Sequence, residues 1–103
     1  MTVMPDRRRI AVIGAGIVGA AIALSLAEAG AHVTVIEGTA PAAGATGKSF
    51  AWLNADVADP AYRALRLRSM AMWRELDASL GLSITWAGRL AWTDRPDEAE
   101  RLR

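Results

Sequence analysis

The first forty residues carry an apolar pattern that predicts a strand, a helix and a second strand. Residues 9–14 read RIAVIG, a β-branched apolar run closed by a glycine, as is typical of a parallel strand buried on both faces. Apolar residues then recur at steps of three and four from Ile17 to Ala29, which predicts a helix ended by Gly30. HVTVIE at residues 32–37 predicts the second strand. Together these elements indicate an α/β fold with one Rossmann-like βαβ unit and parallel strands.

The same stretch has some features of an export signal or a membrane span. Arginines at positions 7–9 precede an apolar run from Ile10 to Ala27 that contains a single serine. Three glycines interrupt the first ten positions of that run, however, and a strand-like segment follows Gly30. An export signal has no need of that second strand, so membrane association is not indicated.

The glycines have the spacing of a dinucleotide-binding loop between a strand and a helix. Gly14 is expected to make the turn out of the strand, and Gly16 to let a pyrophosphate approach the backbone. Gly19 is expected to let the helix pack close to the strand. The first helical amides, near Ile17 and Val18, would point at the phosphates. A glycine-rich turn without any ligand is the alternative interpretation.

Glu37, 18 residues beyond the last of these glycines, bears on which dinucleotide is bound. At the end of the second strand its carboxylate is placed to accept hydrogen bonds from ribose hydroxyls. It would repel a 2′-phosphate, and Gly38 follows it where NADP would favour an arginine. NADP is therefore disfavoured, and NAD and FAD remain.

Residues 38–49, GTAPAAGATGKS, predict a loop where a plain NAD-binding domain would have another helix. This loop favours FAD. Thr46 and Ser49 can donate hydrogen bonds to phosphate or ribose, and Lys48 can offset charge. A mobile linker is the alternative interpretation.

The second half of the chain predicts a long amphipathic helix between shorter elements. Asp59 can cap this helix, with Pro60 in its first turn, and Gly81 can end it. Residues 50–55, 82–86 and 88–93 have strand character, and the last ten residues predict the start of a further helix. One face of the long helix is formed by Tyr62, Leu65, Ser69, Trp73, Leu76 and Leu80.

Composition narrows the function classes. The chain has 103 residues, enough for one domain at most. Its net charge of +1 gives no electrostatic reason to expect a nucleic acid or a membrane surface as partner, so no nucleic acid is expected. The absence of cysteine excludes a disulfide scaffold and thiolate metal sites within these residues, and is compatible with the cytoplasm. The single His32 cannot build a histidine-rich metal site, so no metal is expected.

Four segments in this order resemble the N-terminal region of FAD-dependent oxidoreductases of the D-amino-acid oxidase type. The segments are IAVIGAGIVGAAIALSLAEAGAHVTVIE, then GATGKSFAWLNA, then the helix with Y..L...S...W..L...LG, then GRLAWT. That family includes D-amino-acid, glycine and sarcosine oxidases and D-amino-acid dehydrogenases. The resemblance implies that residues 1–103 are the N-terminal part of a larger FAD-binding domain whose substrate domain is largely absent here.

The resemblance also implies a cofactor site and a reaction. The cofactor would be FAD, and a small-molecule amine or amino acid would lose a hydride from the carbon beside its nitrogen to the flavin. The glycines would hold the pyrophosphate, Glu37 the adenosine ribose, and the second loop the cofactor nearer the flavin. In the second loop the implied contacts are Ala45, Thr46 and Ser49.

Two rival functions stay open at this point, and no catalytic residue is identified. One is an NAD-dependent dehydrogenase, which the loop at 38–49 disfavours. The other is a non-catalytic nucleotide-binding module on the same fold. The resemblance separates neither an oxidase from a dehydrogenase nor amine oxidation from flavin-dependent tRNA modification.

Overall fold

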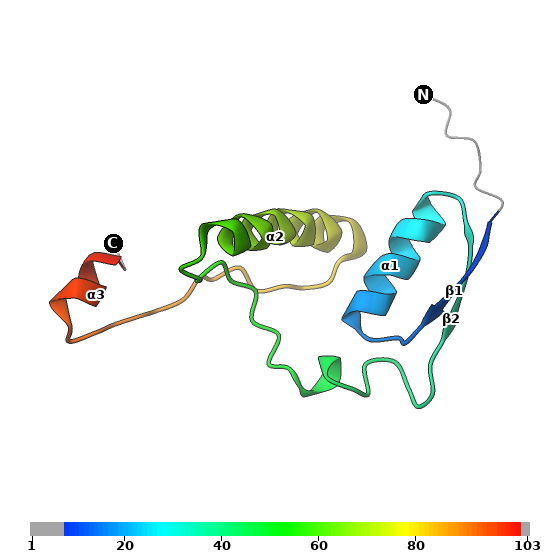
Figure 1. Cartoon of the computed structure of the whole chain (residues 1–103), viewed down its shortest axis with the longest axis horizontal. Coiled ribbons are helices and arrows are strands. Elements are labelled where there is room, and N and C mark those ends of the chain that lie inside the picture. The colour runs from blue at the N-terminus through cyan, green and yellow to red at the C-terminus, as the bar shows by residue number, and fades with distance from the viewer. Residues whose placement is uncertain (1–7, 102–103) are drawn as a thin grey trace, which may run out of the picture. The chain divides into compact units, whose positions relative to one another are not determined.

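The computed structural model describes residues 8–101 and divides the chain into two compact units. The first unit is Met1–Leu53 and the second is Asn54–Arg103. In Figure 1 the first unit runs from blue to green, and the second runs from green to red.

The first unit is the βαβ unit that the sequence predicts. Strand β1 (Arg9–Ile13) and strand β2 (His32–Ile36) pair in parallel, with Arg9 beside His32 and Ile13 beside Ile36. Helix α1 (Ile17–Glu28) connects them and lies along one face of the pair (Figure 1). The predicted α/β class with parallel strands is therefore confirmed.

Two glycines set the tight connection from β1 to α1. Gly14 has a φ of 100°, in the region that side chains disfavour, so it can make the turn out of the strand. A Cβ on Gly19 would lie 2.0 Å from the carbonyl oxygen of Gly14, so the backbone would have to shift to admit any side chain there. Gly19 therefore lets the helix start directly against the turn, as the spacing predicted.

The segment after β2 is a loop, again as predicted. It contains a single 3₁₀ turn, η1 (Thr46–Lys48), and its remaining residues to position 49 form no regular element. Its backbone returns to the Gly14–Gly16 turn, because the amide of Ala42 donates to the carbonyl of Ala15 at 2.9 Å.

The second unit is built on helix α2 (Pro60–Leu80). Asp59 is its N-cap and accepts a hydrogen bond from the amide of Tyr62 at 2.6 Å. Gly81 ends it in the left-handed conformation, with a φ of 64°. The start, the stop and the proline of the first turn were all predictable from the sequence.

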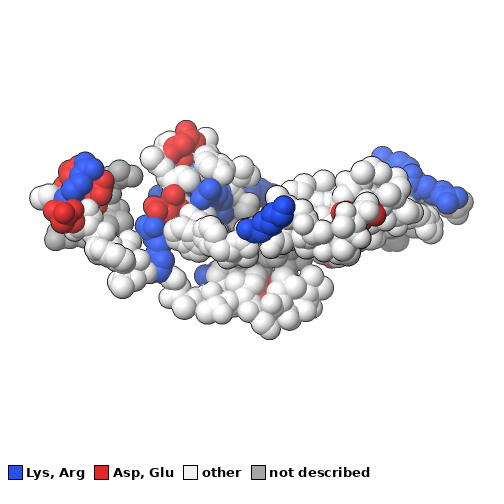
Figure 2. All heavy atoms as spheres, turned by 90° about the horizontal axis from the view of Figure 1, so that it is seen from below, with Lys and Arg blue, Asp and Glu red and all other residues white. Residues whose placement is uncertain are grey.

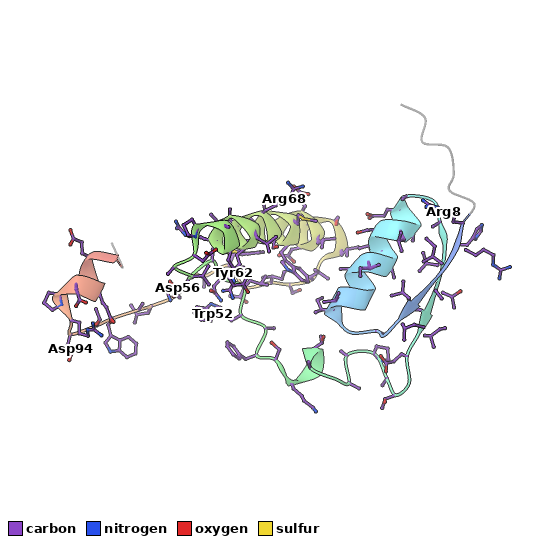
Figure 3. The ribbon with its side chains drawn as sticks, in the orientation of Figure 1. Arg8, Trp52, Asp56, Tyr62, Arg68 and Asp94 are labelled. Carbon is purple, nitrogen blue, oxygen red and sulfur yellow. The ribbon has the colours of Figure 1, made fainter. Side chains whose placement is uncertain are left out.

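The segments that precede and follow α2 are held by side-chain contacts and not by backbone hydrogen bonds between strands. The indole nitrogen of Trp86 donates to Asp77 at 2.9 Å, and the guanidinium of Arg74 lies 4.0 Å from the Trp86 ring centre. At the other end of the helix, Asp56 pairs with Arg89. Figure 3 shows Asp56 and Tyr62 at the N-terminal end of α2.

The three short strands expected at residues 50–55, 82–86 and 88–93 are not formed. Within residues 8–101 the one sheet consists of β1 and β2. A strand is stable only with a neighbour for its backbone groups, and these segments have none in the described chain. Helix α3 (Pro96–Arg101) follows, in agreement with the helix start predicted for the last ten residues. No helix among the described residues is both long and apolar enough to cross a membrane.

Candidate functional site

A hollow of about 570 Å³ lies where the two strands of the first unit end. Because β1 and β2 are parallel, their carboxyl ends share one edge, where the amide of Gly14 donates to the carbonyl of Ile36 at 2.8 Å. Open α/β sheets bind ligands at this edge. The hollow is lined by Val12, Ile13, Gly14, Gly16, Ile17, Val18, Gly19, Ile22, Glu37, Thr39, Ala43, Gly44, Ala45 and Thr46.

All the residues that the sequence singled out for the cofactor line this hollow, with the exceptions of Lys48 and Ser49. The hydroxyl of Ser49 instead accepts a hydrogen bond from the amide of Ala51 at 3.0 Å, in a local turn. Sequence reasoning missed Val12, Ile13 and Ile22 on β1 and α1, and Thr39, Ala43 and Gly44 in the second loop. The small side chains in the loop were the available signal, because a loop that approaches a ligand closely has little room for larger ones.

Glu37 binds two backbone amides across the mouth of the glycine turn. Its Oε2 accepts from the amide of Ala15 at 2.9 Å, and its Oε1 accepts from the amide of Thr39 at 3.0 Å. These bonds, Ala15 first, lower the pKa of Glu37, together with a smaller contribution from the amide of Gly38 and against a small effect of desolvation. Glu37 is therefore a carboxylate at neutral pH.

The second loop reaches the start of α1 through Thr46. The amide of Ile17, the first of the helix, donates to the Thr46 hydroxyl at 3.0 Å. This differs from the expectation that the Ile17 amide faces a phosphate. The next two amides, those of Val18 and Gly19, have no hydrogen-bond partner among the described residues.

The hollow can therefore receive an anion. Two unpaired amides of a first helical turn carry the positive end of the helix dipole, which favours phosphate-like groups. Gly16 and Gly19 have no side chain that could block access to these amides. Glu37 also lines the hollow, and its carboxylate can accept hydrogen bonds from hydroxyl groups of a ligand. In the described part of the chain, no group of three or more His, Cys, Asp or Glu side chains could hold a metal ion.

A strand–turn–helix with an acceptor at the end of the second strand defines the class of dinucleotide-binding proteins. Within that class, the sequence profile described as FAD dependent oxidoreductase, the DAO family, matches residues 9–103. The chain belongs to this family of FAD-dependent oxidoreductases.

Two curated relatives are similar over most of this chain. Both are named "tRNA 5-methylaminomethyl-2-thiouridine biosynthesis bifunctional protein MnmC". The protein from Thiobacillus denitrificans (strain ATCC 25259 / T1) is 41% identical over 83 residues, which are 78% of this chain and 14% of the relative. The protein from Polaromonas naphthalenivorans (strain CJ2) is 38% identical over 92 residues, 82% of this chain and 14% of the relative. The chain thus matches about a seventh of each relative's length, and no solved structure matches it.

These relatives correct the expected partners. The sequence predicted a small-molecule amine or amino acid and no nucleic acid, whereas the relatives are named for the biosynthesis of a tRNA nucleoside. The prediction was wrong because it used the charge of this chain alone. Figure 2 shows acidic and basic side chains scattered over one face with uncharged surface between them. A near-neutral segment says nothing about the charge of the remaining length of such proteins.

Proposed function

We propose that the first unit binds FAD, with the pyrophosphate at the start of α1 and the adenosine ribose at Glu37. The observation that carries this proposal is that the amides of Val18 and Gly19 have no hydrogen-bond partner within residues 8–101, and that both residues line the hollow together with the carboxylate of Glu37. Gly14 and Gly16 leave the backbone accessible there. Membership of the FAD-dependent oxidoreductase family supports FAD over NAD.

The loop at 38–49 is proposed to cover the cofactor on the side toward the flavin. Ala45 and Thr46 line the hollow, so both can lie against the cofactor. Ser49 would need to exchange its bond with Ala51 for one with the cofactor. The remaining contacts with the cofactor would come from polypeptide beyond these residues. Residues 1–103 would then form the N-terminal part of a larger FAD-binding domain.

When bound, FAD supplies a hydride acceptor that oxidises a carbon beside an amine nitrogen. The residues described here would hold and orient the cofactor, and none of them is assigned a proton-transfer role. We propose that the amine belongs to a tRNA nucleoside. The support is the printed name of both relatives, whose product carries a methylaminomethyl group, which is a secondary amine. A cytoplasmic location stays a prediction.

The cofactor half of the proposal is tested by identifying what the purified protein carries. The protein is denatured and the released nucleotide is identified by chromatography and mass spectrometry. FAD is expected. Release of NAD, or reconstitution by neither FAD nor NAD, would contradict the assignment.

The substrate half is tested on the full-length protein by bleaching of its flavin absorbance without oxygen. Unfractionated bacterial tRNA is compared with free sarcosine and free D-alanine as probes. Reduction by tRNA, and its loss after ribonuclease treatment, are expected. Reduction by a free amino acid and not by tRNA would refute the nucleic-acid substrate and leave the FAD assignment standing.

A further inference from the structure

Helix α1 begins without a capping side chain of its own. Its N-cap residue is Gly16, whose φ of −79° and ψ of −177° are the extended geometry of a cap, and no side chain there can accept an amide hydrogen. The first turn also holds no acidic residue. An exposed helix start of this kind would leave its first amides to water.

Thr46 supplies the missing acceptor from 29 residues further along the chain. Its hydroxyl oxygen lies 3.0 Å from the amide nitrogen of Ile17. The cap oxygen of a helix usually belongs to the residue just before it, whereas here it comes from the 3₁₀ turn η1 of the second loop.

Gly16 leaves the space in which this hydroxyl lies. A Cβ on Gly16 would stand 3.0 Å from the Thr46 oxygen, tighter than nearly all such contacts in proteins. A serine or aspartate at position 16 could cap α1 locally, but its Cβ would push the Thr46 hydroxyl from its present position. With glycine at position 16, α1 has no cap from its own N-cap residue, and the cap from Thr46 joins the glycine turn to the second loop.

Two further contacts keep η1 in place. The amide of Ala42 donates to the carbonyl of Ala15, which ties the loop to the glycine turn at a second point. A Cβ on Gly47 would lie 2.3 Å from the carbonyl oxygen of Ala42, so the loop closes tightly on itself. Thr46 is thus held by backbone contacts on the loop side.

We infer that Thr46 is a positioning residue that caps α1 from the second loop. Through this contact the glycine turn at 14–16 and the loop at 38–49 each keep the other in a fixed conformation. The inference rests on the proposed FAD site. Because Thr46 binds the amide of Ile17, the amides of Val18 and Gly19 are the ones left to the pyrophosphate. Loss of the hydroxyl would loosen both loops and lower cofactor affinity, while the amides of Val18 and Gly19, the proposed pyrophosphate donors, stay in place.

The test compares Thr46→Val, which keeps the shape and removes the hydroxyl, with Thr46→Ser, which keeps the hydroxyl. Thr34→Val is the matched control, because Thr34 is exposed on β2 and does not line the hollow. Hydrogen exchange of the Ile17 amide is measured in the cofactor-free full-length protein. The FAD dissociation constant is measured by titration of the same samples.

Thr46→Val is expected to speed exchange at Ile17 and to raise the FAD dissociation constant, each by about five- to tenfold, as for a lost helix cap. Thr34→Val is expected to match the parent protein, and Thr46→Ser, which keeps the hydroxyl, is expected to keep the slow exchange at Ile17. Unchanged exchange in Thr46→Val would overturn the capping contact. Faster exchange with unchanged affinity would overturn the positioning role. If the parent protein bound no FAD, the proposed function would fail, while the exchange data would still decide the capping contact.

Should Thr46→Val not fold, Gly16→Ala perturbs the same contact from the other side. Its methyl group presses on the Thr46 oxygen, so faster exchange at Ile17 is expected again. Exchange equal to that of the parent protein would count against the contact.

Discussion

Glu37 does more at the residue scale than its position at the end of β2 suggested. Both of its oxygens already hold backbone amides, those of Ala15 and Thr39, before any ligand is considered. The remaining lone pairs can still accept from ribose hydroxyls. Glu37 is therefore a proposed cofactor ligand, and it also stabilises the glycine turn through its bond with the amide of Ala15.

We predict that Glu37→Gln weakens FAD binding and that Glu37→Arg weakens it more. Glutamine keeps one acceptor oxygen but turns an NH₂ group toward an amide donor, and arginine keeps no acceptor. Titration of the cofactor-free variants with FAD should show this order. Glu28→Gln, an exposed carboxylate at the end of α1, is the control. Equal affinities in all four proteins would contradict the assignment.

The lowered pKa of Glu37 also predicts an acid dependence. A carboxyl group with a depressed pKa in the folded state stabilises that state above its unfolded pKa, and this stabilisation is lost as pH falls through the folded value. The free energy of unfolding should thus decline with acidification below about pH 4.5, the ordinary value for this group. Denaturant unfolding at a series of pH values should give a shallower decline for Glu37→Gln. A parallel decline in both proteins would rule out this role.

At the element scale, the start of α1 and the turn η1 should behave as one unit. We predict that Gly16→Ala and Thr46→Ala are not additive in the cofactor-free protein. Gly16→Ala crowds the Thr46 oxygen at 3.0 Å, but without that oxygen the nearest Thr46 atom is its Cβ, at an ordinary 4.0 Å. The alanine at 16 should therefore cost less stability in the Thr46→Ala background. A double-mutant cycle measured by denaturant unfolding tests this. Strict additivity would show that the two positions do not interact.

The substitution Gly16→Val tests the role of Gly16 in the proposed cofactor site. A branched side chain there would fill the approach to the backbone, and we expect purified Gly16→Val to retain no FAD. The flavin-to-protein absorbance ratio is the measurement. A normal ratio would mean that Gly16 does not face the pyrophosphate.

In the second unit, α2 and the segment after it are joined at Asp77. The indole N–H of Trp86 is the main cause that lowers the pKa of Asp77, ahead of the opposing desolvation and the amides of residues 82–84. We predict that Trp86→Phe raises this pKa toward its ordinary value. Carboxyl-carbon NMR across an acid titration reports it directly. The exposed Trp92→Phe is the control, and a shift equal in both variants would exclude the indole as the cause.

At the scale of the whole molecule, the described chain has almost no core. Val12 is the one buried apolar side chain among the described residues, whereas Ile13 is 76% exposed at the end of its strand. Leu90 and Trp92 in the second unit are 86% and 85% exposed. Such surfaces favour association with other polypeptide.

We therefore predict that residues 1–103 alone are marginally stable and show no amine-dependent turnover. A two-stranded sheet with one helix buries too little apolar surface to offset the entropy of ordering. Thermal melting and analytical ultracentrifugation should reveal a broad transition and self-association. A sharp cooperative melt of a monomer would refute the stability claim, and flavin-dependent dye reduction by this fragment would refute the second claim.

Local signals in the sequence were sufficient for β1, α1, β2 and α2, and for the loop that follows β2. Gly14 and Gly19, the apolar steps of α1 and the caps of α2 act over a few residues, so their effects can be read along the chain. The bond from Ile17 to Thr46 and the bond from Ala15 to Glu37 join distant positions, and no periodicity encodes them. The strands expected at 50–55, 82–86 and 88–93 did not form for the same reason, since strand formation depends on a partner that local pattern does not supply.

The contacts of the second loop also fix its length. Ala42 is anchored to Ala15, and four positions later Thr46 must arrive at the amide of Ile17. One inserted residue adds up to about 3.5 Å of chain, more than the whole 3.0 Å between the two capping atoms. An insertion between these anchors would uncap the helix, whereas one after Ser49 would leave both anchors in place. The interval from 42 to 46 therefore has a fixed length in this architecture, and we expect insertions to be tolerated after Ser49 and not between the two anchors.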